Sequence, residues 1–256
     1  MRIHLPGGKI SFMKSIALIP ARYAATRFPG KLMQLLGNKS VILHTYENTV
    51  ATLLFDEVIV VTDSSIIFNE ITENGGYAIM SRQEYESGSD RIAEAAADIE
   101  VDVIINVQGD EPFIKRDPLK DLLAVFEKDD RHLVEVASLM HEIKEAKLVA
   151  DPNIVKVIVD KNMNAIYFSR SVIPFHRDKG SPVVYHKHIG IYAYRKKALM
   201  NFTQWDISPL EATEKLEQLR YIENGIKIKM VLTNESPVSI DTPEDLERAR
   251  KNENLF

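Results

Sequence analysis

The segment from Ile16 to Lys31, IALIPARYAATRFPGK, constrains the fold of this chain more than any other part of it. It opens with a short apolar run that does not alternate with polar residues, which is typical of a parallel strand buried on both faces. Pro20 ends the strand, and the loop that follows carries Arg22, Arg27 and Lys31. Open α/β sheets bind their ligands at the carboxyl ends of the strands. The segment therefore predicts an α/β sheet with an anion site at the end of its first strand.

The alternative interpretation of this loop is a solvated basic surface. The position of the charges favours a binding site, because no Asp or Glu occurs from Met1 to Tyr46, whereas seven Lys or Arg residues do. Three cations without a neighbouring carboxylate suit a polyanion such as a nucleoside triphosphate. The formal net charge of the whole chain is −5, which argues against a broad nucleic-acid surface.

The composition excludes several kinds of site and shows no membrane-spanning segment. It has 256 residues and no cysteine, which excludes disulfides, thiolate metal sites and cysteine nucleophiles and is compatible with a reducing cytosol. No apolar run approaches the length of a membrane span, and residues 1–12 lack the apolar core of a signal peptide. We therefore expect no membrane partner. Met13 directly precedes the first strand, and we interpret residues 1–12 as an extension outside the fold.

Strands and helices alternate through the first half of the chain. The patterns predict strands over 16–19, 56–63, 77–81 and 101–107, and helices over 40–54, 64–74, 90–99 and 117–128. Ser40 is the expected N-cap of the first helix. Alternation at this spacing predicts a doubly wound, mostly parallel sheet.

The second half has a different character. It predicts strands over 135–141, 155–160, 165–169, 189–194, 226–232 and 238–240, and helices over 195–205 and 209–224. The turn at 161–164 joins a hairpin, and Thr242 is the expected cap of a last helix. The simplest account is a single α/β domain over 13–256 with an antiparallel insertion at about 135–195.

Two aspartates are candidates for a metal site. Asp110 follows the strand at 101–107, at the sheet edge that carries the basic loop, and Gly109 before it permits close approach of the backbone to a ligand. A carboxylate beside a triphosphate site is typical of Mg²⁺, which also keeps phosphate and water ligands. One carboxylate rarely suffices, and Asp241 is the best second candidate. From local sequence alone, a helix cap is at least as good an interpretation of Asp241. A turn residue is the weaker interpretation of Asp110, because a buried strand precedes it.

Motifs along the whole chain resemble those of one enzyme family. They are ALIPARYAATRFPGK, SRQEYESGSDRIAEAA, INVQGDEPFI, NAIYFSRSVIPF, KHIGIYAYRKKAL, SPLEATEKLEQLRYIENG and VSIDTPEDLERAR. In this order they resemble the 3-deoxy-manno-octulosonate (Kdo) cytidylyltransferases, also called CMP-Kdo synthetases, over nearly all of residues 13–251. The resemblance implies a nucleotide-diphospho-sugar transferase-like fold and transfer of CMP from CTP to the anomeric 2-hydroxyl of Kdo. It also implies Mg²⁺, a cytoplasmic location, a role in lipopolysaccharide biosynthesis and a homodimer formed by the inserted segment.

The same resemblance assigns residues to the two substrates. It places the nucleotide on Arg22, Arg27, Lys31, Arg82, Ser87, Gln108 and Asp110. It places the sugar on Arg170, His188, Tyr192, Glu217 and Gln218. It gives Mg²⁺ to Asp110 and Asp241, and catalysis to Arg22, Lys31, Asp110 and Asp241. Local sequence leaves other interpretations open on the sugar side: a structural histidine, a core tyrosine and a solvated helix face.

Two alternative functions remain at this point. One is a cytidylyltransferase for another 2-keto sugar acid, such as an 8-amino Kdo analogue or an acylneuraminate. The other is a non-catalytic nucleotide-binding module. A dinucleotide dehydrogenase and a Walker-type NTPase are disfavoured, because the chain has neither G-x-G-x-x-G after its first strand nor G-x-x-x-x-G-K-[ST].

Overall fold

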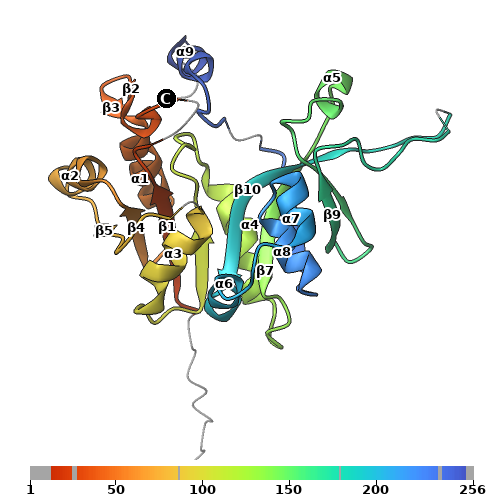
Figure 1. Cartoon of the computed structure of the whole chain (residues 1–256), viewed down its shortest axis with the longest axis horizontal. Helices are drawn as coiled ribbons and strands as arrows, with labels where there is room; N and C mark the ends of the chain where they lie inside the picture. The colour runs from red at the N-terminus through yellow and green to blue at the C-terminus, as the bar shows by residue number, and fades with distance from the viewer. Residues whose placement is uncertain (1–12, 25–27, 86, 179, 236–237, 252–256) are drawn as a thin grey trace, which may run out of the picture.

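A mixed sheet forms the centre of the protein (Figure 1). The structure, a computed structural model, describes residues 13–24, 28–85, 87–178, 180–235 and 238–251. In the sheet, seven strands follow the order β11-β7-β10-β6-β1-β4-β5, and β8 and β9 continue from β10. The strands are β1 (Ser15–Ala21), β4 (Glu57–Thr62), β5 (Ala78–Met80), β6 (Val103–Asn106), β7 (Val136–Glu142), β8 (Lys156–Val159), β9 (Ala165–Ser169), β10 (His186–Arg195) and β11 (Ile228–Leu232). A small separate pair is formed by β2 (Leu35–Leu36) and β3 (Lys39–Ser40).

Helices cover both faces of this sheet. They are η1 (Lys31–Met33), α1 (Val41–Ala51), α2 (Ser65–Glu73), α3 (Gly88–Ala97), α4 (Arg116–Glu127), α5 (Ala146–Val149), α6 (Lys196–Phe202), α7 (Pro209–Glu214), α8 (Gln218–Glu223) and α9 (Pro243–Lys251). Apolar residues of α1, α2, α4 and α9 pack in one core cluster, and those of α3, α6 and α8 pack in a second. The predicted doubly wound sheet is confirmed.

Strand β1 lies in the middle of the sheet, with β4 and β6 as parallel neighbours. All seven of its residues are buried. Ala17 and Ile19 belong to one core cluster, whereas Ile16 and Leu18 belong to the other. Side chains alternate between the faces of a strand, so an unbroken apolar run is needed when both faces are covered. The burial of both faces explains why the segment from Ile16 to Lys31 begins with an unbroken run of apolar residues.

Two predicted helix caps are present. The hydroxyl oxygen of Ser40 accepts a hydrogen bond from the backbone N–H of Leu43 at 3.2 Å at the start of α1. At the start of α9, Thr242 Oγ1 accepts from the N–H of Asp245 at 3.2 Å, and Asp245 Oδ2 accepts from the N–H of Thr242 at 2.9 Å. These contacts satisfy N–H groups that have no partner within the helix.

The predicted helix over 209–224 is wrong in one respect, because the structure has two short helices there. Lys215 between them has a φ of 56°, in the left-handed region. Arg220 Nε donates to Glu211 Oε2 at 2.7 Å, and both side chains are buried. Residues nine apart lie on opposite faces of a continuous α-helix, so this ion pair requires the break. The predicted short strand at 238–240 is also absent, and this stretch is extended chain outside any strand.

The structure narrows the predicted insertion. Strand β7 pairs with β11 along its length, and Tyr192–Arg195 of β10 pairs with β6, so both lie in the main sheet. Residues 143–185, which we call the arm, connect them and contain α5, β8 and β9. The arm extends away from α1 and α2 (Figure 1). Within the described ranges, no helix is long and apolar enough to cross a membrane.

Candidate active site

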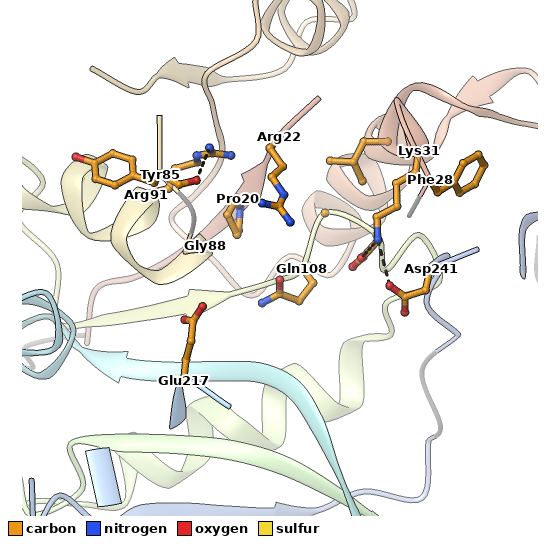
Figure 2. Close-up of a pocket in the computed structure, with 13 residues that line it drawn as sticks. Pro20, Arg22, Phe28, Lys31, Tyr85, Gly88, Arg91, Gln108, Glu217 and Asp241 are labelled. Atoms are coloured by element: carbon orange, nitrogen blue, oxygen red, sulfur yellow. Dashed lines mark hydrogen bonds and ion pairs between the residues drawn. The ribbon is translucent and has the colours of Figure 1, made fainter. Parts of the chain in front are cut away.

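A cavity of about 330 Å³, which we call the central cavity, lies at the carboxyl ends of β1 and β6 (Figure 2). Leu18 of β1 is in register with Asn106 of β6, so the chain segments that follow these strands run side by side. Of the residues predicted for the site, six line the cavity: Arg22, Lys31, Gln108, Asp110, Glu217 and Asp241. The structure therefore brings these side chains together around a cavity at the sheet edge where the sequence predicts a ligand site.

Lys31 lies between two carboxylates. Its Nζ is 2.5 Å from Asp110 Oδ2 and 3.2 Å from Asp241 Oδ1. Burial acts to lower the pKa of Lys31, but the charges of the two aspartates outweigh it and raise the pKa. No acidic residue is near Lys31 in the sequence. The fold brings it next to Asp110 and Asp241, which lie 79 and 210 residues further along the chain.

Backbone contacts hold the two aspartates in place. The carbonyl of Gly109 accepts from Thr45 Oγ1 of α1 at 2.9 Å, and the carbonyl of Asp110 accepts from the N–H of Ile240 at 2.9 Å. A Cβ on Gly109 would lie 3.0 Å from the carbonyl oxygen of Pro20. The close approach that requires glycine here is therefore to the end of β1. These contacts join the segment that carries Asp110 to the one that carries Asp241, to α1 and to the end of β1.

A third carboxylate, Glu111, is buried next to this pair. Burial raises its pKa to about 8, and the charges of Asp110 and Asp241 add to the effect. One of its oxygens, Oε2, is buried without a hydrogen-bond partner in the part of the chain that the structure describes. The raised pKa favours the protonated, neutral form of Glu111 beside Asp110.

A second cavity of about 250 Å³, the side cavity, adjoins the first. Three of the residues predicted for the sugar, His188, Tyr192 and Gln218, line it. Gln108 and Glu217 line both cavities. Gln108 Nε2 donates to the carbonyl of Gly190 at 3.1 Å, where the pairing of β10 with β7 is irregular. The two cavities are therefore neighbouring compartments with a shared wall.

Two serines at the beginning of α3 hold the side chain of Glu217 in place. Its Oε2 accepts from Ser87 Oγ at 3.0 Å and from Ser89 Oγ at 2.9 Å. Burial raises the pKa of Glu217, and the two serine hydrogen bonds act in the opposite direction. Ser87 thus acts through Glu217 and as the N-cap of α3, because it lines neither the central nor the side cavity.

His188 is enclosed by other side chains. Its ring lies 5.0 Å from that of Phe168 and 5.3 Å from that of Tyr192, between centroids. Its Nε2 lies 3.0 Å from Ser138 Oγ. Burial lowers the pKa of His188 to about 3, so the imidazole is neutral at physiological pH and can exchange hydrogen bonds without adding charge.

We expect His188 to make stability depend on pH. Between about pH 6.5 and pH 3 the unfolded chain binds a proton on this residue and the folded protein does not, so stability falls as the pH falls. The wild type should lose about 2 kcal/mol more free energy of unfolding between pH 7.5 and pH 5 than His188→Gln. Urea unfolding of both proteins at the two pH values measures this difference. Equal losses would contradict the buried neutral state.

The structure does not bring two predicted residues to either cavity. Arg82 is exposed, and its Nη2 donates to Asp98 at 2.9 Å on the outside of α3. Arg170 donates through Nε to the carbonyl of Glu214 at 2.9 Å and through Nη1 to that of Pro152 at 3.1 Å. Backbone carbonyls and a surface carboxylate therefore satisfy these cations. A third predicted residue, Arg27, lies outside the described residues.

Sequence reasoning missed Phe28, Tyr85 and Arg91, which line the central cavity. A signal existed only for Arg91. It lies one helical turn before Ala95, on the apolar face of the helix that the sequence predicts, and a charge on such a face requires buried partners. Phe28 and Tyr85 lie in loops, where the sequence has no periodicity from which the orientation of a side chain can be predicted.

Asp110 and Asp241 fit a Mg²⁺ ion that takes most of its ligands from phosphate and water. Within the described ranges, no group of three or more His, Cys, Asp or Glu side chains is arranged to hold a metal ion. Asp110 and Asp241 nevertheless already share one cation, the ammonium of Lys31. Two carboxylate ligands suit Mg²⁺ at a phosphate site, where phosphate and water oxygens complete the coordination.

Comparisons with known proteins agree with this fold. The sequence profile of the cytidylyltransferase family matches residues 16–228. The 3-deoxy-manno-octulosonate cytidylyltransferase of Flavobacterium johnsoniae is 60% identical over 238 residues, which is 93% of this chain and 98% of the relative. That of Christiangramia forsetii is 55% identical over 236 residues, which is 92% of this chain and 95% of the relative.

A solved structure supports the same assignment. CMP:2-keto-3-deoxy-manno-octonic acid synthetase complexed with CTP has a TM-score of 0.87 and 40% identity, over 93% of this chain and 97% of that one. The fold and the family profile define a cytidylyltransferase, a class of nucleotidyltransferase. Within that class, the chain belongs to the 3-deoxy-manno-octulosonate cytidylyltransferase family.

Proposed function

We propose that the protein transfers CMP from CTP to the anomeric 2-hydroxyl of Kdo, as a cytoplasmic step of lipopolysaccharide biosynthesis. The hydroxyl oxygen forms a bond to the α-phosphorus of CTP and gives up its proton to solvent. The bond from the α-phosphorus to the bridging oxygen breaks, and pyrophosphate leaves. The observation that carries this proposal is the shared wall of the two cavities. Gln108 and Glu217 line both, so a nucleotide in the central cavity and a sugar acid in the side cavity would be neighbours.

In this proposal, the cations of the central cavity bind the triphosphate. Arg22 follows the end of β1 and Lys31 begins η1, and both side chains line the same cavity (Figure 2). Phosphoryl transfer depends mainly on positioning and on neutralising charge as the leaving group departs. Arg22 and Lys31 are suited to offset the charge that develops on pyrophosphate.

Asp110 and Asp241 would hold Mg²⁺ in this scheme. When bound, Mg²⁺ neutralises phosphate charge and polarises oxygen atoms that it coordinates. The chain's own contribution is to hold the two carboxylates together through the backbone contact between Asp110 and Ile240 and the shared contact with Lys31. Gln108 and Glu217 line both cavities, so they are placed to contact the nucleotide and the acceptor.

The products test this function. Purified protein with CTP, Mg²⁺ and Kdo should form CMP-Kdo and pyrophosphate in a ratio of one to one, measured by mass spectrometry and a pyrophosphate assay. Hydrolysis of CTP to CMP without a sugar nucleotide would contradict transfer. Binding of CTP without any product would identify a nucleotide-binding module instead.

We also propose that the arm joins two copies of the chain into a homodimer. The arm exposes four large apolar side chains: Ile166, Val172, Phe175 and Val184, which are 53%, 41%, 85% and 53% exposed. Exposed apolar side chains that gather on one projecting segment favour a protein interface. The inserted segment is also the part that the family resemblance assigns to dimer formation.

We expect Phe175→Asp to convert the dimer to a monomer, because a buried interface does not tolerate an unpaired carboxylate. Light scattering after size-exclusion chromatography should give twice the mass of one chain for the wild type and the mass of one chain for the variant. Leu53→Asp is the matched control, since Leu53 is also 85% exposed but lies after α1. A dimer that persists in Phe175→Asp would exclude this part of the arm from the interface.

A further inference from the structure

Arg91 of α3 is a buried cation that the proposed mechanism does not use. Its side chain is only 3% exposed, and it lines the central cavity. Figure 2 shows Arg91 and Tyr85 at one end of this cavity and Lys31 and Asp241 at the other. If the triphosphate binds at the Lys31 end, where the cation and the carboxylates lie, the nucleoside occupies the Arg91 end.

The guanidinium of Arg91 connects three separate segments of the chain. Nη1 donates to the carbonyl of Ala21 at 2.6 Å, at the end of β1 and directly before Arg22. Nη2 donates to the carbonyl of Tyr85 at 3.3 Å, in the loop before α3. Nη2 also pairs with Asp63, which follows β4. One side chain thus sets the positions of two walls of the cavity relative to each other.

The remaining donor of this side chain is not paired. Nε is buried and has no hydrogen-bond partner among the residues that the structure describes. Native proteins pair nearly all of their buried donors, so an exception beside a cavity is expected where a ligand completes the hydrogen bonding. The residue that carries this unpaired donor lines the cavity at the end that the nucleoside would occupy.

We infer that Arg91 is a positioning residue for the nucleoside end of the central cavity, an inference that rests on the proposed function. A planar guanidinium can donate to carbonyls in two directions and pair with a carboxylate at the same time. A lysine keeps the charge beside Asp63 but donates from one point, so it cannot reproduce both carbonyl contacts. Without these contacts, the end of β1 and the Tyr85 loop lose their fixed separation.

The test compares two ligands that differ by the nucleoside. Arg91→Ala would empty a buried site and could fail to fold, so the variant of choice is Arg91→Lys. Isothermal titration calorimetry in the presence of Mg²⁺ measures the Kd of CTP and of inorganic tripolyphosphate. We expect Arg91→Lys to raise the Kd of CTP about tenfold and to leave that of tripolyphosphate within about twofold of the wild type.

Arg220 supplies the matched control. It is also buried, pairs with Glu211 and donates to the carbonyls of Phe202 and Trp205, but it does not line the central cavity. Arg220→Lys should therefore destabilise the protein, as Arg91→Lys does, without changing the Kd of CTP. A thermal unfolding midpoint for each variant verifies that both are folded at the temperature of the titration.

Three outcomes would overturn the inference. They are an unchanged Kd of CTP in Arg91→Lys, an equal rise for CTP and tripolyphosphate in that variant, and an equal rise of the Kd of CTP in Arg220→Lys. In each of these cases the wild type still binds CTP, and the proposed function stands. A wild type that binds no CTP overturns the proposed function and this inference together.

Discussion

Asp110→Asn is expected to lower turnover by at least about 1,000-fold while the protein stays folded. The substitution removes one of the two negative charges that face the shared cation position, and it keeps the shape of the side chain. Lys31 retains its contact with Asp241 at 3.2 Å, and the carbonyl of Asp110 still accepts from Ile240. The fold therefore has little reason to change, whereas the charge required beside the triphosphate is lost.

Pyrophosphate release at saturating CTP and Kdo measures this effect, and circular dichroism and thermal unfolding report on the fold. Asp117→Asn is a suitable control, because Asp117 is an exposed carboxylate in the first turn of α4. Turnover of Asp110→Asn within tenfold of the wild type would remove Asp110 from the reaction. Loss of turnover that accompanies unfolding would assign Asp110 a structural role instead.

Lys31→Met is expected to raise the affinity of the free protein for a divalent metal ion and to lower kcat/KM for CTP. The ammonium contacts both Asp110 and Asp241, so in the free protein it competes with a divalent cation for the same oxygens. Its removal should raise the affinity for Mn²⁺ or Mg²⁺ alone by about tenfold. It should also lower kcat/KM for CTP by about 100-fold, because a cation at the phosphates is lost.

Electron paramagnetic resonance of free Mn²⁺ measures the first effect without any nucleotide, and steady-state kinetics measure the second. Lys39→Met is the matched control, since Lys39 forms an ion pair with Glu47 at 2.6 Å and does not line the central cavity. Unchanged or weaker Mn²⁺ binding in Lys31→Met would show that the ammonium does not compete with the metal. Unchanged kinetics would remove Lys31 from the catalytic site.

The sequence predicted most of the fold because local patterns and burial agree along most of the chain. The apolar run of β1 and the polar caps Ser40 and Thr242 are examples. The prediction failed at Lys215, where the helical pattern continues but the chain breaks to pair Glu211 with Arg220. Such a break depends on a tertiary contact, which periodicity does not report.

The site was predictable where the ends of strands determine position. Arg22 and Asp110 follow β1 and β6, and parallel strands end at one edge of the sheet. The side chains of Arg82 and Arg170 were assigned by resemblance, but their partners in the structure are a carboxylate of α3 and backbone carbonyls. The directions of long, flexible side chains follow from local partners that a motif does not contain.

The most direct test of the proposed function is pyrophosphate release with CTP, Mg²⁺ and one of three acceptors: Kdo, its 8-amino analogue or N-acetylneuraminate. We predict release with Kdo and none above background with the other two. Release only with another acid would contradict Kdo as the acceptor and reassign the side cavity around His188 and Gln218. Release with none of the three would contradict transfer to these sugar acids altogether.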